Sequence, residues 1–177
     1  TWKIEAAGKI DADIAVTKDD EFPDLPRFGV RMFLDKKLSA VRYFGMGPQE
    51  SYCDKHQAAS HGLYQANVDD LHEDYIRPQE NGSHYDCEYV ELNNSRYGIV
   101  VSAENAFSFN ASYYTQEELE EKTHNYELTE SDSVVFCVDY ALNGIGSNSC
   151  GPVVLEQYRF DDVLFRFQFT LIPYIKG

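Results

Sequence analysis

The residues whose types and spacing best suit contact with a ligand lie in a glycine-rich stretch near the C-terminus, Gly144-Ile-Gly-Ser-Asn-Ser-Cys-Gly-Pro152. Its three glycines allow backbone angles that other residues resist, and short hydrogen-bonding side chains surround a single thiol. These features are typical of a ligand-facing loop. The candidate contact residues are Ser147, Asn148, Ser149 and Cys150.

Two more reactive interpretations of this loop are rejected. A phosphate-binding loop leads into a helix whose N-terminus faces the phosphate, whereas Pro152 and two valines follow here. A nucleophilic cysteine needs a neighbouring base to activate its thiol, but only Ser and Asn side chains surround Cys150. We therefore expect Cys150 to line the loop without taking part in chemistry.

Hydrolysis of a glycosidic bond would need two positioned carboxylates, about 5 Å apart for retention or about 6.5–9.5 Å apart for inversion. The candidates are Glu50, Glu80, Asp86, Glu88 and Glu91. The chain carries 30 acidic residues, most of which must be solvated surface groups. We expect no catalytic residue in this chain.

Histidine and cysteine spacings also argue against a metal site. The histidines are His56, His61, His72, His84 and His124, without a His-x-x-x-His pair that would place two ligands on one helical face. The cysteines are Cys53, Cys87, Cys137 and Cys150, without a Cys-x-x-Cys pair. We expect no metal and no cofactor. Free thiols in a reducing compartment, and hence a cytoplasmic location, are the simplest interpretation, although two disulfides remain possible.

The charge balance restricts the partners of this chain. With 15 basic and 30 acidic residues among 177, the formal net charge is −15, which disfavours binding to nucleic acid or to an anionic membrane. The longest apolar run, Val163–Ile172, is too short to cross a membrane and contains Arg166. A neutral partner or substrate fits better. A first residue of Thr1 suggests a piece of a longer chain.

The elements that must position these residues are mainly strands, since apolar and polar residues alternate with a period of two. The predicted strands are Ile10–Val16, Phe28–Leu34, Ala40–Phe44, Tyr85–Leu92, Tyr97–Ala103, Phe107–Tyr113, Ser133–Tyr140, Val153–Tyr158 and Leu164–Leu171. We expect a hairpin among the first three strands, and a long irregular connection over 54–78. Asn93-Asn-Ser95 has the composition of a turn.

One short helix interrupts this pattern. Thr115 and Glu118 have the spacing of a capping box, which predicts a helix over Gln116–Lys122. No repeat or linker divides the chain. The sequence therefore predicts a single all-β domain over residues 1–177, an antiparallel β-sandwich with one short helix.

Five phrases of sequence, in order along the chain, resemble the C-terminal domain of the large bacterial β-galactosidases of glycoside hydrolase family two. They are Leu25-Pro-Arg-Phe-Gly-Val30, Tyr43-Phe-Gly-Met-Gly-Pro-Gln-Glu-Ser-Tyr52, Arg77-Pro-Gln-Glu-Asn-Gly82, Phe109-Asn-Ala-Ser-Tyr-Tyr-Thr-Gln-Glu-Glu-Leu119 and Gly144-Ile-Gly-Ser-Asn-Ser-Cys-Gly-Pro152. Several phrases in the right order are far more specific than any one of them.

This resemblance implies a fold, a reaction and partners. The fold would be the later part of a galactose-mutarotase-like supersandwich, and the catalytic carboxylates would lie in a preceding (β/α)₈ barrel. The partners would be that barrel and a galactoside such as lactose, in an enzyme that forms oligomers. In one version of the family a tryptophan of the glycine loop reaches the galactose site, and Cys150 stands at that place in a loop one residue shorter. The resemblance thus implies that Ser147–Cys150 line the sugar site.

Two other functions remain open. The chain could be a free-standing mutarotase-like epimerase that uses His and Glu, or a free-standing carbohydrate-binding module with an aromatic platform. The alternation of Phe165, Phe167 and Phe169 favours core over platform.

Overall fold

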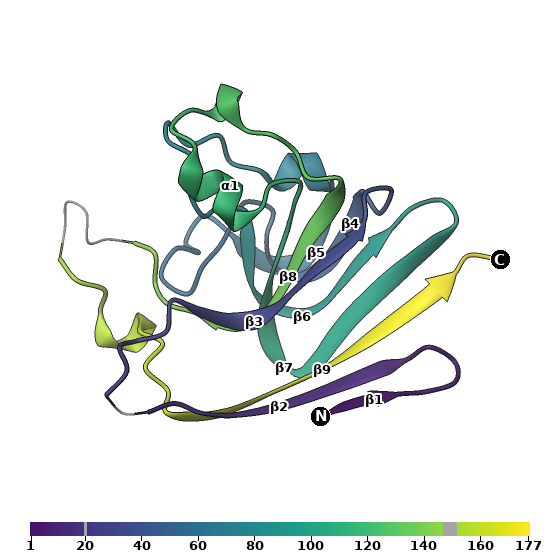
Figure 1. Ribbon diagram of the computed structural model, residues 1–177, viewed down its shortest axis with the longest axis horizontal. Coiled ribbons are helices and arrows are strands. Elements are labelled where there is room, and N and C mark those ends of the chain that lie inside the picture. The colour runs from purple at the N-terminus through teal and green to yellow at the C-terminus, as the bar shows by residue number, and fades with distance from the viewer. Residues whose placement is uncertain (20, 147–151) are drawn as a thin grey trace.

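The computed structural model describes residues 1–19, 21–146 and 152–177. Its strands are β1 (Trp2–Ile4), β2 (Ile10–Thr17), β3 (Arg27–Asp35), β4 (Ala40–Gly47), β5 (Ser60–Asn67), β6 (Ser83–Asn93), β7 (Tyr97–Ser112), β8 (Ser133–Leu142) and β9 (Leu164–Ile175). Its helical segments are α1 (Gln116–Glu121) and the single 3₁₀ turns η1 (Val68–Leu71), η2 (Asn125–Glu127) and η3 (Glu156–Tyr158). The prediction of an all-β, antiparallel fold with one short α-helix is confirmed (Figure 1).

All nine strands belong to one hydrogen-bonded antiparallel sheet that branches at the long strand β7. One edge of β7 pairs with β6. The other edge pairs first with β9, through Ser102, and then with β8, from Ser108 onward. The sheet therefore divides into a branch that continues through β9 to β2 and β1, and a branch that continues through β8 to β3.

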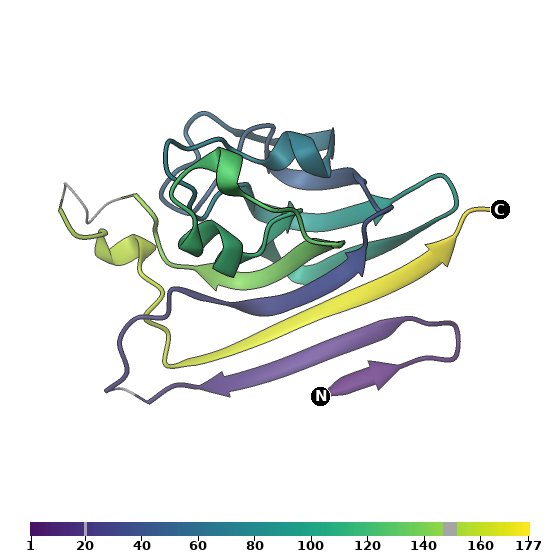
Figure 2. The ribbon, with the colours of Figure 1, turned by 45° about the horizontal axis from the view of Figure 1, so that its top comes forward.

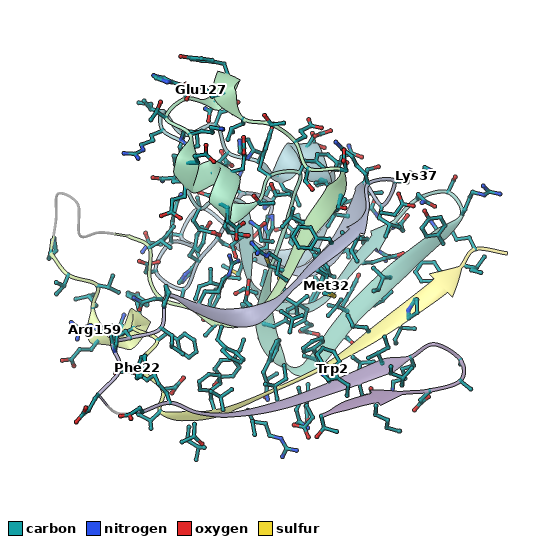
Figure 3. The ribbon with its side chains drawn as sticks, in the orientation of Figure 1. Trp2, Phe22, Met32, Lys37, Glu127 and Arg159 are labelled. Atoms are coloured by element: carbon teal, nitrogen blue, oxygen red, sulfur yellow. The ribbon has the colours of Figure 1, made fainter. Side chains whose placement is uncertain are left out.

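The two branches pack face to face, which makes the molecule a sandwich although its strands form one sheet. Figures 1 and 2 show β3 and β8 lying across β2 and β9, and the side chains in Figure 3 fill the space between these layers. Phe28 of β3 meets Phe165 of β9 edge to face, with ring centroids 4.9 Å apart. Phe165, Phe167 and Phe169 are 6%, 3% and 3% exposed, which confirms that they belong to the core.

The cap of helix α1 confirms the sequence signal in part. The Thr115 hydroxyl accepts the backbone N–H of Glu118 at 3.1 Å, as the capping box predicts. The Glu118 carboxylate accepts the N–H of Thr129 at 2.8 Å, so it ties the helix to the chain that leads into β8.

Strand pairing differs from the prediction at the N-terminal end. The predicted hairpin among the first three strands is wrong, because β2 pairs with β1 and β9, β3 pairs with β8, and β4 pairs with β5 and β6. Alternation reports which face of a strand is buried, but it carries no information about the partner that covers each edge. The prediction of a β6–β7 hairpin is confirmed, and Asn94 accepts the N–H of Tyr97 in its turn at 3.0 Å.

Three segment boundaries are also corrected. The connection over 54–78 contains a strand, β5, whose polar, half-exposed residues hide its pattern. The two strands predicted over Tyr97–Tyr113 are one strand, β7. The strand predicted over Val153–Tyr158 is wrong, because this segment contains the turn η3 and no strand. Over the described ranges, no helix is long and apolar enough to span a membrane.

Candidate functional site

The four residues that the sequence singles out, Ser147, Asn148, Ser149 and Cys150, lie outside the described residues. The structure does describe both ends of their loop, which leave β8 at Leu142 and return through 152–160. These ends determine where the loop begins and returns. The described part of the site consists of the groups that hold these two ends of the loop.

The Asp54 carboxylate holds the first end of the loop. It accepts the backbone N–H of Ile145 at 3.1 Å and that of Gly146 at 2.7 Å. A Cβ atom at Gly144 or Gly146 would lie 2.8 Å or 2.7 Å from an Asp54 oxygen, closer than real Cβ contacts. Both glycines are thus needed for the close approach of the carboxylate to the backbone.

The two ends of the loop are joined to each other beneath this carboxylate. The N–H of Gly144 donates to the carbonyl of Tyr158 at 2.8 Å. The Cys53 thiol lies 3.6 Å from the carbonyl oxygen of Leu142 and 3.8 Å from that of Tyr158. The Asn143 side chain accepts the N–H of Phe160 at 2.9 Å. Cys53 and Asp54, which directly follow the family phrase that ends at Tyr52, thus hold the base of the loop.

A second carboxylate, Glu50, connects this phrase to the neighbouring loop. It accepts the backbone N–H of Gly82 at 2.8 Å and also accepts from the Lys55 ammonium and the Tyr75 hydroxyl. Burial alone would raise the pKa of Glu50, but these three donors lower it below the usual range. Glu50 is therefore a structural anion that fixes the 48–55 segment.

An ion cluster around the buried Asp139 lies on the other side of this segment. Arg27 donates to Asp139 at 3.1 Å and 2.8 Å, and its second amino group lies 3.3 Å from Glu80. Burial raises the pKa of Asp139 to about 6 despite the adjacent guanidinium, and burial likewise raises the pKa of Glu80. The cluster joins β3, β8 and the 77–82 phrase, which are far apart in the sequence.

The candidate acidic residues occupy different environments. Glu50 and Glu80 are the members just described, and Glu91 accepts a hydrogen bond from Tyr174. Glu88 is exposed, and Asp86 has a left-handed backbone with φ of 55°. Glu50 and Glu80 are thus held by cationic or hydroxyl partners within the fold, and their role is to stabilise it.

The histidines and thiols show no common centre. Among the described residues, no group of three or more His, Cys, Asp or Glu side chains could hold a metal ion. His84 is buried and stacks on Phe109, with centroids 5.0 Å apart, and burial lowers its pKa to about 4. Cys53, Cys87 and Cys137 are free thiols.

Three residues of this site, Asp54, Arg27 and Asp139, were not singled out from the sequence. Asp139 had a usable signal, because it is the one charge in the run Val134–Tyr140, which the structure buries on both faces. A lone charge in such a run needs a buried partner. Arg27 had only its place within a family phrase, and Asp54 had only its place two residues after one.

Comparisons with known proteins identify the relatives of this chain. A family model described as beta galactosidase small chain matches residues 1–171. Over 171 residues, 97% of this chain, the sequence is 51% identical to a beta-galactosidase of Actinobacillus pleuropneumoniae and 39% identical to one of Staphylococcus xylosus. It is 32% identical to the beta-galactosidase of Kluyveromyces lactis over 168 residues.

The chain spans about a sixth of the length of these relatives, 17%, 17% and 16% respectively. The predicted resemblance to β-galactosidases is thereby confirmed, and it extends over nearly all of the sequence rather than over the five phrases alone. This chain belongs to the beta-galactosidase small-chain family.

Proposed function

We propose that this chain is the C-terminal part of a β-galactosidase that releases terminal, non-reducing β-D-galactose from galactosides such as lactose. It packs against a catalytic barrel that holds the two reacting carboxylates, in a cytoplasmic, oligomeric enzyme. The observation that carries this proposal is the family match over residues 1–171 together with relatives about six times as long, all named beta-galactosidase.

In this function the loop over residues 147–151 closes one wall of the galactose site. Its residues Ser147, Asn148, Ser149 and Cys150 contact sugar, and Cys150 lines the wall without reacting. Support comes from the base of the loop, where Asp54 and Cys53 hold both ends in place. Such fixed ends are what a binding wall requires, because ordering a loose loop on each binding event would cost affinity.

A free-standing carbohydrate-binding module receives less support, because the alternating phenylalanines that could have formed a platform are buried. A mutarotase-like epimerase also receives less support. Its histidine would have to reach a sugar, but His84 stacks within the aromatic core and burial lowers its pKa. Neither observation favours these alternatives over the galactosidase.

The test is an assay with a chromogenic β-galactoside on the isolated chain and on the complete enzyme that contains it. We expect turnover from the complete enzyme and none from the isolated chain. Clear turnover by the isolated chain at enzyme-like rates would overturn the assignment of catalysis to the barrel. Mutarotation of galactose by the isolated chain would favour the epimerase.

Two variants of the complete enzyme test the loop. Cys150→Ala should raise KM while kcat stays within about twofold, since wall contacts contribute uniform binding. Asp54→Ala should raise KM more strongly because the base of the loop loses its anchor. Asp24→Ala, an exposed carboxylate, is the matched control. Unchanged kcat and KM in the first two variants would remove the loop from the active site.

A further inference from the structure

The branching of the sheet creates a cavity at the middle of β7. The ladder of β7 with β9 ends at Ser102, and the ladder with β8 begins at Ser108. The residues between them, 103–107, pair with neither strand along that edge, so β8 and β9 diverge (Figure 1). Asn105 and Ala106 are exposed there. A wedge-shaped space between diverging strands follows from this topology.

The cavity in this wedge has a volume of about 410 Å³, within the usual range for small-molecule sites. Its floor is β7, and its walls are the end of β8, the η3 turn with the residues after it, and the start of β6. Its lining includes the side chains of Tyr85, Asn105, Ser108, Tyr140, Tyr158 and Asp162.

The polar groups of these side chains are free to bind a ligand. None of the side chains of Asn105, Ser108, Tyr158 and Asp162 makes a hydrogen bond to another residue in the described part of the chain. The Ser108 side chain is only 5% exposed. A buried polar group without an internal partner needs water or a ligand. The cavity therefore offers an amide, hydroxyls and a carboxylate.

The aromatic rings supply a complementary apolar surface. Tyr140 has one face covered by Phe165, at 4.8 Å between centroids, and Tyr85 stacks on His56 at 5.8 Å. Tyr158 makes no ring contact with any other described aromatic side chain and is half-buried. Its ring can therefore accept the apolar face of a ligand, while the hydroxyl remains available for hydrogen bonds.

The charges lining the cavity favour a neutral ligand. Two carboxylates, Asp86 and Asp162, are matched in number by two guanidinium groups. Arg166 is engaged in a two-bond pair with Asp13, at 2.6 Å and 2.5 Å, and Arg159 donates to the carbonyl of Val154 at 3.1 Å. Arg166 is thus occupied by Asp13, and the two carboxylates of the cavity would repel phosphate or another anion.

We propose that this cavity binds a neutral saccharide, with one sugar face on the Tyr158 ring and the hydroxyl groups on Asn105, Ser108 and Asp162. A polyhydroxylated, uncharged molecule with apolar C–H faces matches both sets of groups. The cavity adjoins the base of the loop described above, with which it shares Cys53, Leu142 and Tyr158, and its binding of a saccharide does not depend on galactoside hydrolysis.

The test is calorimetric titration of the complete protein that contains this chain, with lactose and separately with cellobiose as probes. Cellobiose lacks a terminal galactose, so its binding reports the cavity and not a galactose-specific active site. We expect saturable cellobiose binding with a Kd in the millimolar range. Tyr158→Ala and Asn105→Leu should each weaken it by about fivefold to tenfold, by loss of the ring face and of the amide.

Tyr126→Ala is the matched control, because Tyr126 is 82% exposed in η2 and takes no part in the cavity. Asn105→Leu changes an exposed strand residue, so it tests the site even if Tyr158→Ala disturbs folding. Absence of saturable cellobiose binding up to 100-fold above the expected Kd would overturn the proposal. Binding that both cavity variants leave unchanged would do the same. If the complete protein bound cellobiose but did not hydrolyse lactose, this result would count against the proposed function and not against the cavity.

Discussion

The two ends of strand β7 lie in interiors that differ in their content of buried polar residues. The region around residues 97–102 of β7, together with β2 and β9, is called the apolar half. The region around residues 107–112 of β7 is called the polar half, and it also includes residues 48–55, 81–87 and 135–139. The buried polar residues of the described chain all belong to the polar half: Glu50, Ser51, Asn81, Ser83, His84, Ser108, Asn110 and Asp139. The apolar half contains Phe167, Phe169, Val101 and Leu171 instead.

This contrast shows where the fold departs from simple burial of apolar surface. Buried polar groups require partners, and most of those in the polar half have them: Asn110 donates to the carbonyl of Asn81 at 2.5 Å, and Ser51 accepts from Tyr85 at 2.9 Å. One His84 nitrogen is nevertheless buried without a partner. An apolar interior would be the simpler route to stability, so the polar half depends on its hydrogen bonds as well as on apolar burial.

The largest effect is expected in the apolar half. Phe167→Ala should lower the free energy of unfolding by about 4 kcal/mol, because it removes a ring that is 3% exposed and packs on Phe169 at 4.8 Å. Urea denaturation followed by tyrosine fluorescence measures this. Phe33→Ala, at a ring that is 56% exposed, should cost under about 1 kcal/mol. Equal losses for the two variants would contradict a core placed between the two branches.

A somewhat smaller loss is expected when the ion cluster of the polar half is broken. Arg27→Met should lower the free energy of unfolding by about 3 kcal/mol, because Asp139 then remains buried without its cation and the half-buried Glu80 loses the same partner. The same denaturation experiment on Arg31→Met, whose pair with Glu117 is largely exposed, should show a change below about 1 kcal/mol. If Arg27→Met proved as mild as Arg31→Met, the cluster would contribute little to joining β3 and β8.

The smallest effect concerns acid sensitivity in the polar half. Burial lowers the pKa of His84 to about 4 from the usual 6.5, so the folded state binds this proton more weakly than the unfolded chain. Its contribution to stability is therefore complete above pH 6.5 and decreases as the pH falls toward 4. His84→Phe should reduce the loss of stability between pH 7 and pH 4.5 by about 2 kcal/mol relative to the parent protein.

Other groups titrate in the same range, so the comparison between variant and parent is essential. Asp139, whose pKa burial raises to about 6, contributes in the opposite direction, because its stabilisation of the folded state declines as the pH rises from 3.8 to 6. The groups that act on His84 are the carbonyl of Met46 and the Glu50 carboxylate. Parallel pH profiles for His84→Phe and the parent would show that His84 does not titrate differently on folding.

The sequence by itself determined the features that depend on neighbouring residues. A period of two placed Phe165, Phe167 and Phe169 on one buried face of β9, and the spacing of Thr115 and Glu118 located helix α1. The turn at Asn94 located the β6–β7 hairpin. Each of these depends on contacts over a few positions, for which residue type and spacing are sufficient evidence. The ordered phrases also identified the family.

Only the tertiary structure decided which distant segments meet. β3 pairs with β8 about a hundred residues later, Arg27 reaches Asp139 at a separation of 112 residues, and Asp54 holds Gly146 at a separation of 92. Strand edges have the same backbone donors and acceptors everywhere, so residue patterns do not specify the partner of an edge. The choice depends on how all the side chains pack together. The branch at β7, the polar half and the cavity between β8 and β9 all follow from that choice.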